Sequence, residues 1–424
     1  MIIISKKMAE RKRIYLCLAH MSDEGLEQKY IKEAFDTNWV VPLGPNVNGF
    51  EADLEKFVGE DKRVVALASG TAAVHLSLIA CDVQAGDEVL VQSFTFCASS
   101  HPITYLGATP VFVDSEKDTW NMDPELMEEA IRDRIAKTGK KPKAIVPVSL
   151  YGMPYNITRI MEIANQYGIP VIEDAAEGFG SKFNGQVLGT FGEYGILSFN
   201  GNKMITTSGG GALICPDKEA ADKIMWYATQ AREAYPYYQH EAIGYNYRMS
   251  NICAGIGRGQ MTVVDEHLRH HKHVQKMYEE LLAGVDGITM MKAPSEKYDA
   301  NYWLCTMCID PEVRIKGQEN AYKKVITGAV GGAAGVIHAV NSAVTDCQPN
   351  DNVEALRMFM DAAQIEARPL WKPMHKQPVY KHSPAYTNGV SEGLFKIGMC
   401  LPAGPYVTDD DVHYIVDCIK SAIV

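Results

Sequence analysis

Ile196-Leu-Ser-Phe-Asn-Gly-Asn-Lys203-Met-Ile-Thr-Thr-Ser-Gly-Gly-Gly-Ala-Leu213 is the stretch around which the chain is organised. Two short apolar runs, at residues 195–199 and 212–215, predict a pair of strands. The polar turn between them presents a single amine, Lys203. A lysine in such a turn is most often a solvated surface charge, so a chemical role for Lys203 requires support from the rest of the chain.

Upstream of this stretch, apolar runs alternate with segments of helical spacing. This alternation is typical of an α/β fold, in which a mostly parallel sheet carries helices on both faces. The expected strands are residues 64–68, 89–91, 111–113, 144–148 and 171–172, and the expected helices are residues 74–80, 98–106, 124–136 and 157–167.

The length of 424 residues is too great for one ordinary core and indicates two or three packed units. A long charged helix at about residues 263–282 is expected to lead into a smaller α+β domain. We therefore expect a large α/β domain over residues 1–264 and a smaller domain over residues 265–424.

Residues 314–352 show the weakest secondary-structure pattern of the chain. Their apolar centre, residues 326–340, has 15 residues with four glycines and a histidine, which is too short for a membrane span.

Charge and cysteine content exclude several classes of protein. The 41 basic and 52 acidic residues give a formal charge of −11, spread along the chain, which argues against a nucleic-acid partner. The first residues lack the apolar core of a secretory signal, so a cytoplasmic enzyme without a membrane partner is expected. The ten cysteines are then expected to be reduced.

Two groups of possible metal ligands are set aside. Cys305 and Cys308 lie in a strand-like run, where residues three apart point to opposite faces. His267 and His271 share a helix face, but interleaved basic residues and the lack of a third ligand favour a solvated face. We expect no metal site.

Polar and aromatic residues gather at the carboxyl ends of the expected strands, where ligands bind in open α/β sheets. Taken singly, each has an ordinary structural explanation: Asp174 as a helix cap, Ser198 as a turn residue, Phe96 as core. The set comprises the amine of Lys203, the carboxylate of Asp174, a helix start at Gly70 and Thr71, the hydroxyl of Ser198, and the ring of Phe96.

Together these groups meet the requirements of pyridoxal phosphate (PLP). A lysine forms a Schiff base with this cofactor, and an acidic side chain keeps its pyridine nitrogen protonated. Its phosphate needs hydrogen-bond donors, which a helix N-terminus supplies. Its ring needs a flat apolar partner, which Phe96 can provide.

With these residues the chain resembles a known family. This family is the sugar-nucleotide aminotransferases of the DegT/DnrJ/EryC1/StrS group, within the fold-type I PLP enzymes. The resemblance covers nearly the whole chain. Its motifs are Trp39-Val-Val-Pro-Leu-Gly-Pro45, Ala68-Ser-Gly-Thr-Ala-Ala73, Glu173-Asp-Ala-Ala-Glu177, Ser198-Phe-Asn-Gly-Asn-Lys203, Thr207-Ser-Gly-Gly-Gly211, Gly244-Tyr-Asn-Tyr-Arg-Met-Ser-Asn251 and Arg368-Pro-Leu-Trp-Lys-Pro-Met-His375.

The resemblance implies a role for each matching residue. Lys203 would bind the cofactor covalently, Asp174 would pair with its pyridine nitrogen, and Phe96 would stack on its ring. The phosphate would be held by Gly70, Thr71 and Ser198, and by Asn246 of the neighbouring subunit, because family members are homodimers with shared active sites. The segment with Trp371, Lys372 and His375 would lie near the nucleotide sugar.

Three features depart from the family pattern. Glu177 would stand near the cofactor's ring hydroxyl, where many relatives have glutamine or histidine. A glutamate at this position is similar to the bacillosamine-type subgroup, whose members aminate C4 of UDP-linked N-acetylated 6-deoxy-4-keto sugars. Ser149 stands where histidine is common. The segment 314–352 is longer than the family's usual connection.

The resemblance implies transamination of a nucleotide-linked keto sugar with L-glutamate as amino donor, by a ping-pong route that serves glycan biosynthesis. Two alternatives are weighed. Sugar dehydratases of the family replace the lysine by histidine, so Lys203 favours transamination. A non-catalytic PLP-binding regulator, with residues 314–352 as a partner contact, is the second; the sequence offers no basic face for DNA.

Overall fold

The computed structural model describes residues 11–59, 61–322 and 347–424, and the apolar run at 326–340 lies outside these ranges. Its centre is a large sheet in two four-stranded portions, which parallel bridges from Ile145 to Val171 and from Val148 to Asp174 join. Strands pair in parallel except for both neighbours of β9. The strand order is β1 (Arg63–Leu67), β9 (Gly211–Cys215), β8 (Tyr194–Ser198), β5 (Ile172–Asp174), then β4 (Ala144–Val146), β2 (Glu88–Gln92), β3 (Thr109–Val113) and β14 (Ala385–Tyr386).

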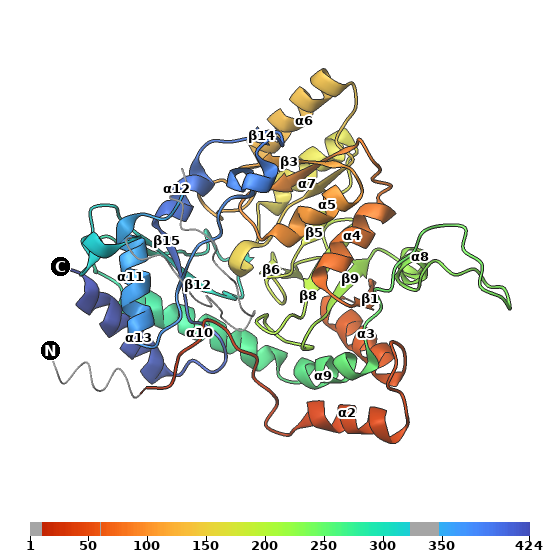
Figure 1. Ribbon diagram of the computed structural model, residues 1–424, viewed down its shortest axis with the longest axis horizontal. Helices are drawn as coiled ribbons and strands as arrows, with labels where there is room; N and C mark the ends of the chain where they lie inside the picture. Colours follow the sequence, from red (N-terminus) through yellow and green to blue (C-terminus); the bar gives the residue numbers. More distant parts are fainter. Residues whose placement is uncertain (1–10, 60, 323–346) are drawn as a thin grey trace.

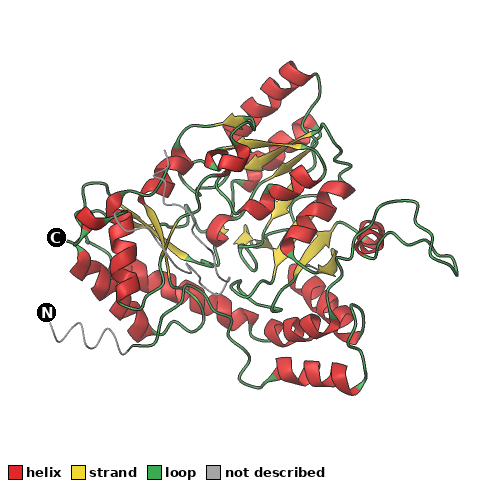
Figure 2. Ribbon diagram, viewed as in Figure 1, coloured by secondary structure: helices red, strands yellow, loops and turns green. Residues whose placement is uncertain are grey.

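Helices cover both faces of this sheet (Figures 1 and 2). Side chains along β1 alternate between two cores: Val64 and Ala66 join one, and Val65 and Leu67 join the other. This is the pattern of a strand buried on both faces. The first core takes in α3 (Pro45–Val58), α6 (Pro124–Thr138) and α7 (Ile157–Tyr167), and the second takes in α4 (Gly70–Ala80), α5 (His101–Tyr105) and α8 (Lys218–Ala228). The expected mostly parallel α/β fold is confirmed.

A second, antiparallel sheet has its own core. Its order is β10 (Ile288–Met290), β12 (Cys305–Ile309), β15 (Gly398–Leu401) and β13 (Arg368–Pro369). The helices α10 (Val264–Leu281), α11 (Asp351–Ala362) and α13 (Asp409–Ala422) contribute to this core, and α12 (Val390–Ile397) contacts its strands. Ile14 packs in the same core, and β14 returns to the large sheet beside β3. The domain boundary near residue 265 stays a prediction.

The remaining elements are short or peripheral. Two helices, α2 (Leu26–Asp36) and α9 (Asn251–Met261), pack against each other. A three-stranded sheet joins β11 (Tyr298–Asp299), β6 (Lys182–Phe183) and β7 (Gln186–Val187). The 3-10 helices are η1 (Cys97–Ser99), η2 (Leu150–Gly152), η3 (Gln318–Asn320), η4 (Met374–Lys376) and η5 (Pro378–Tyr380). None of the described helices combines the length and apolarity that a membrane span requires.

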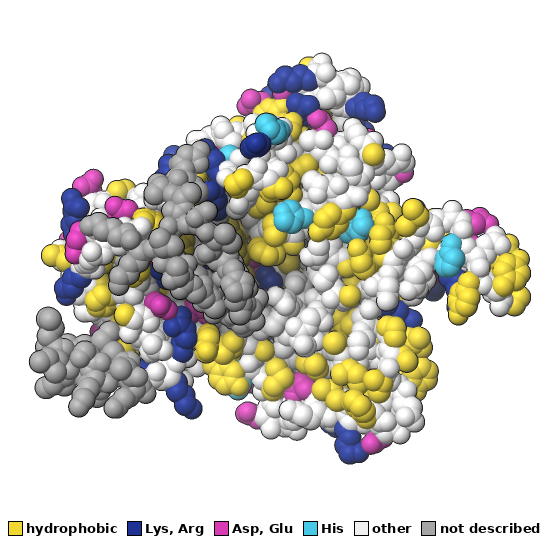
Figure 3. Space-filling model, viewed as in Figure 1, with side chains coloured by type: hydrophobic (Ala, Val, Ile, Leu, Met, Phe, Trp, Pro, Cys, Tyr) yellow, Lys and Arg dark blue, Asp and Glu magenta, His cyan; other side chains and the backbone are white. Residues whose placement is uncertain are grey.

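An arm beyond α8 projects from the molecule (Figure 1). Apolar side chains are exposed on this arm and also between α2 and α3, and Figure 3 shows apolar surface in both regions. They are Tyr235, Tyr237, Tyr238 and Ile243 on the arm, Phe35 near the end of α2, and Trp39, Val40, Val41 and Leu43 between the helices.

The structure corrects one expectation from the sequence. His267 and His271 are buried, not on a solvated face, because α10 lies between the two cores. Nδ1 of His267 lies 3.1 Å from the carbonyl oxygen of Met204, and Nδ1 of His271 lies 3.0 Å from that of Tyr302. Burial lowers the pKa of His271 to about 3, so this ring is neutral.

The two cysteines of the C-x-x-C pair face different cores. Cys305 lies in the core of the second sheet, whereas Cys308 packs against the core of the large sheet. None of the ten cysteines, all of which lie in the described ranges, forms a disulfide bond. Within the described residues, no group of three or more His, Cys, Asp or Glu side chains could hold a metal ion.

Candidate active site

The start of α4 forms an anion-binding corner. Ser69 caps the helix by accepting a hydrogen bond from the amide of Ala72. A Cβ placed on Gly70 would lie 3.1 Å from the Cβ of Ser198, so Ser198 borders the first helical turn. A Cβ on Gly211 would lie only 2.3 Å from the amide nitrogen of Gly70, so this strand position requires glycine. Within the described residues, the N–H groups of Gly70 and Thr71, in the first turn of α4, have no hydrogen-bond acceptor, so they can bind a phosphate.

Asp174, the last residue of β5, is a buried carboxylate with two donors. It is 5% exposed. Ser99 donates from Oγ to Oδ2 over 2.6 Å, and the amide of Ala176 donates to Oδ1 over 3.2 Å. Burial raises the pKa of Asp174, whereas the hydrogen bond from Ser99 and the charge of Lys203 act in the opposite direction. The site thus holds a carboxylate that a cationic ring nitrogen would stabilise.

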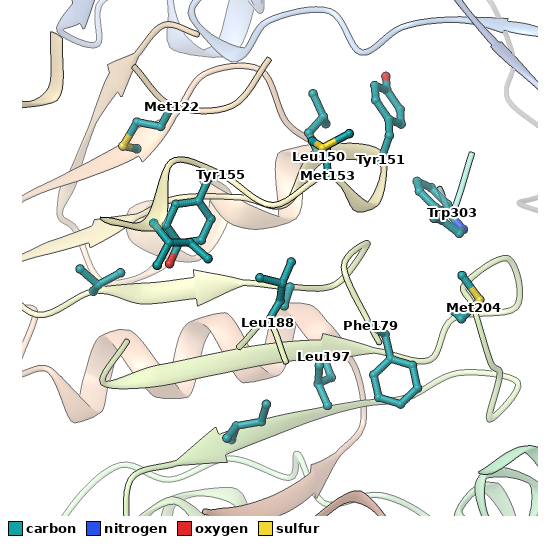
Figure 4. Close-up of a cluster of buried hydrophobic side chains, with 14 of the residues drawn as sticks. Met122, Leu150, Tyr151, Met153, Tyr155, Phe179, Leu188, Leu197, Met204 and Trp303 are labelled. Atoms are coloured by element: carbon teal, nitrogen blue, oxygen red, sulfur yellow. The ribbon is translucent and has the colours of Figure 1, made fainter. Parts of the chain in front are cut away.

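The Lys203 side chain points into the protein. It is 14% exposed, and its Nζ lies 3.5 Å from Oε1 of Glu177 and 3.9 Å from the centre of the Trp303 ring. The indole N–H of Trp303 donates to the carbonyl of Asn202, which holds the turn that carries the lysine. Figure 4 shows Trp303 between Tyr151 and Met204. The surface-charge explanation of Lys203 therefore does not apply.

Glu177 is buried between Lys203 and a backbone turn. Its Oε2 accepts a hydrogen bond from the amide of Tyr151 over 2.8 Å. Burial raises the pKa of Glu177, and Lys203 opposes this rise. An amine and two carboxylates, those of Glu177 and Asp174, therefore share one buried site.

Phe96 and the segment 371–375 form a cleft at the rim of the site. Phe96 is 49% exposed, and its ring centre lies 5.3 Å from that of Trp371. Nδ1 of His375 lies 2.7 Å from Oγ of Ser93, which places this histidine beside the end of β2. The cleft has a volume of about 350 Å³. It is lined by Thr95, Phe96, Cys97, His101, Trp371, Lys372, Met374, Gln377 and Val379.

Asn246 stands apart from these groups. It is exposed on the returning strand of the arm, where it forms a bridge with Thr229. Among the described residues, no hydrogen bond joins it to Lys203, Asp174 or Ser198.

The sequence assigned no role to four residues of the site: Ser99, Tyr151, Asn301 and Trp303. Asn301 is fully buried, and its amide donates to the carbonyls of Glu177 and Phe179. Ser99 lies on a short helical turn. Tyr151 follows β4 closely, so its position after a strand end could have indicated a place at the site. Asn301 and Trp303 reach the site from the loop before β12, and no local pattern indicates this.

Comparisons with known proteins show the family of this chain. The model of the DegT/DnrJ/EryC1/StrS aminotransferase family matches residues 22–327 and 318–420. EpsN of Bacillus subtilis (strain 168), whose name describes a pyridoxal phosphate-dependent aminotransferase, is 42% identical over 412 residues, covering 96% of this chain and 95% of its own. GDP-perosamine synthase of Escherichia coli O157:H7 is 31% identical, covering 96% of this chain and 98% of its own.

A solved structure of similar fold is a DegT DnrJ EryC1 StrS aminotransferase from Brucella abortus. It has a TM-score of 0.79 and 26% sequence identity, covering 94% of this chain and 95% of its own. These matches of sequence and fold establish the class of this protein. The chain belongs to the DegT/DnrJ/EryC1/StrS aminotransferase family and is a PLP-dependent sugar aminotransferase.

Proposed function

We propose that this enzyme transfers an amino group from L-glutamate to C4 of a nucleotide-linked 4-keto-6-deoxy sugar, most simply a UDP-linked sugar N-acetylated at C2. The observation that carries the proposal is the convergence of Lys203, Asp174 and Glu177 in one buried site beside the N-terminus of α4. The chemistry of this donor set fits the cofactor of the family. Among the described residues, no observation favours the regulator alternative.

PLP, when bound, supplies an electron sink for the transfer of an amino group. Lys203 would bind its aldehyde carbon covalently, and Asp174 would keep its ring nitrogen protonated. The first turn of α4, with Gly70 and Thr71, and the hydroxyl of Ser198 would hold its phosphate. Phe96 would cover one face of its ring, and Glu177 would lie near its ring hydroxyl.

The same lysine would move a proton in each half-reaction, as base toward the amino donor and as acid toward the sugar. Its Nζ would take a proton from the α-carbon of the amino donor, and later return a proton at C4 of the sugar. Glu177 and the face of Trp303 hold Nζ inside the site from two sides. Their contacts would keep the released amine close to the reacting atoms.

We further propose a homodimer in which Asn246 of each subunit reaches the phosphate of the other. The exposed apolar side chains of the arm and of the region between α2 and α3 favour burial against a second copy. The exposed position of Asn246 on the arm agrees with a role across an interface. Light scattering on the purified protein would report the mass of the dimer, and a monomer would contradict the proposal.

The nucleotide has two candidates. Glu177 favours UDP through its resemblance to the bacillosamine-type subgroup, whereas the similarity to GDP-perosamine synthase favours GDP. Trp371 and Lys372 line the cleft where a sugar nucleotide would enter, and His375 follows them in the chain, beside Ser93.

A spectroscopic experiment tests the function. The purified protein with PLP should be yellow, bleach with L-glutamate, and recolour when a 4-keto sugar nucleotide accepts the amino group. UDP-, dTDP- and GDP-linked keto sugars should be compared by their rates of recolouring. Recolouring with none of the three, by a protein that bleaches with L-glutamate, would contradict the proposed acceptor class.

Replacement of Ser99 by alanine tests how Asp174 is held. The Ser99 hydroxyl lowers the pKa of the Asp174 carboxylate, so its loss raises that pKa further. As pH falls, the variant should therefore lose PLP at a higher pH than the wild type. At neutral pH its affinity for PLP should fall about 10- to 100-fold, the effect of losing one hydrogen bond to a charged group. Titration of PLP by absorbance measures both effects, and an unchanged pH profile would contradict them.

A further inference from the structure

Tyr151 occupies a strained turn between the cofactor site and the substrate cleft. It is 3% exposed and follows β4, in the 3-10 turn η2. Its φ angle is +52°, in the left-handed region that a bulky side chain rarely adopts. Such a conformation persists only where the surroundings hold it, and it is often associated with function.

Contacts on both sides hold this turn. The amide of Tyr151 donates to Oε2 of Glu177 over 2.8 Å. The next residue, Gly152, has a φ of +91°, and a Cβ there would lie 1.8 Å from Oδ1 of Asn301. The turn is therefore fixed from the side of Glu177 and from the side of Asn301.

The Tyr151 hydroxyl makes a different contact from its amide. It accepts a hydrogen bond of 2.8 Å from the amide of Trp371, and it lies beside the thiol of Cys400. One residue thus contacts the carboxylate next to Lys203 through its main chain, and the start of the segment 371–375 through its side chain.

That segment is one wall of the cleft. Trp371 packs near Phe96, and further along the amide of Met374 donates to the carbonyl of Ser93 over 2.8 Å. The amide of His375 also donates to Oγ of Ser93 over 3.2 Å. The wall is thus held at Ser93 near one end and by the Tyr151 hydroxyl at the other.

We propose that Tyr151 is a positioning residue that sets specificity for the sugar acceptor, because its hydroxyl fixes the backbone of Trp371 and with it the wall of the cleft. This inference rests on the proposed function for the identity of the acceptor. The amide of Tyr151 serves Glu177 independently, so loss of the hydroxyl alone should leave the half-reaction with L-glutamate intact.

Replacement of Tyr151 by phenylalanine removes the hydroxyl and keeps the ring and the amide. The rate of bleaching by L-glutamate should stay within about twofold of the wild type. The KM for the keto sugar nucleotide should rise about tenfold, because the part-buried Trp371 amide loses its acceptor. The Kd for UDP and for GDP, measured by calorimetry on the PLP-loaded protein, should rise for the nucleotide that the wild type binds. Hydrogen exchange at the Trp371 amide should become faster.

Tyr278→Phe is the matched control. Its hydroxyl is also buried and also makes one bond to the backbone, to the carbonyl of Pro402 over 2.9 Å, but it lies in the second core away from the cleft. This variant should leave the KM and the Kd unchanged. If Tyr151→Phe does not fold, Ser93→Ala is the second variant, because it removes the hydroxyl that holds His375 in the same segment. An unchanged KM for the keto sugar nucleotide in Ser93→Ala would contradict a positioning role for this wall of the cleft.

The outcomes separate this inference from the proposed function. A Tyr151→Phe protein with wild-type KM and Kd would overturn the inference, as would equal slowing of both half-reactions. A wild type that bleaches with L-glutamate but recolours with no sugar nucleotide would overturn the proposed function. In that case the nucleotide Kd and the exchange of the Trp371 amide would still decide the role of Tyr151.

Discussion

The Lys203→Ala protein is expected to form no covalent bond with PLP. Its rate of amino transfer should fall about 100- to 10,000-fold, the usual contribution of a positioned proton-transfer group. Lys203 is the amine that the described structure places against Glu177 and Trp303, next to Asp174. Borohydride reduction of the PLP-loaded wild type, followed by peptide mass spectrometry, should place the adduct on Lys203. The variant should show no adduct.

Two further variants separate chemistry from folding. Lys203→Arg keeps a cation between the Glu177 carboxylate and the Trp303 ring, so it should fold like the wild type and remain inactive. Lys182→Ala removes an exposed lysine on β6 and should leave both the adduct and turnover unchanged. Amino transfer at the wild-type rate by Lys203→Ala would contradict the assignment of this lysine.

Much of this site could be predicted because parallel strands bring their carboxyl ends to one edge of a sheet. Asp174 and Ser198 end neighbouring strands, and Gly70 starts the helix that follows β1. These three residues therefore meet at one edge of the sheet because of the order of its strands. The antiparallel direction of β9 does not change this.

The supporting residues could not be predicted in this way. Asn301 and Trp303 come from a loop about 100 residues after Lys203 in the chain, so no local pattern links them to the site. The error at His267 and His271 has a related cause. Charged neighbours suggested a solvated helix, but α10 is covered on two sides, and neutral histidines can be buried against backbone carbonyls.

The adjacent carboxylates Glu173 and Asp174 should respond in opposite ways to replacement by their amides. They follow each other in β5, so their side chains point to opposite faces of the sheet. Asp174 lies on the side of Lys203. Glu173 instead accepts hydrogen bonds from the amides of Gly189, Phe191 and Gly192, which fold the loop before β8.

Asp174→Asn should therefore fold normally and fail in catalysis. A neutral amide cannot keep the cofactor's ring nitrogen protonated, so turnover should fall about 100- to 1,000-fold, as when one preorganised electrostatic partner is removed. The melting temperature without PLP should stay within about 3 °C of the wild type, because burial already disfavours the charged form of Asp174. Retained turnover would contradict the role of Asp174 at the ring nitrogen.

Glu173→Gln should show the reverse. Glutamine has one acceptor oxygen, and its NH₂ group would face an amide that now lacks a partner, at a cost of about 1–3 kcal/mol. The melting temperature should fall by about 3–8 °C. The absorbance of bound PLP and the rate of bleaching should stay near those of the wild type. If the two variants lost PLP to the same extent, the prediction would be contradicted. The opposite faces of β5 to which Glu173 and Asp174 point would then not correspond to different functions.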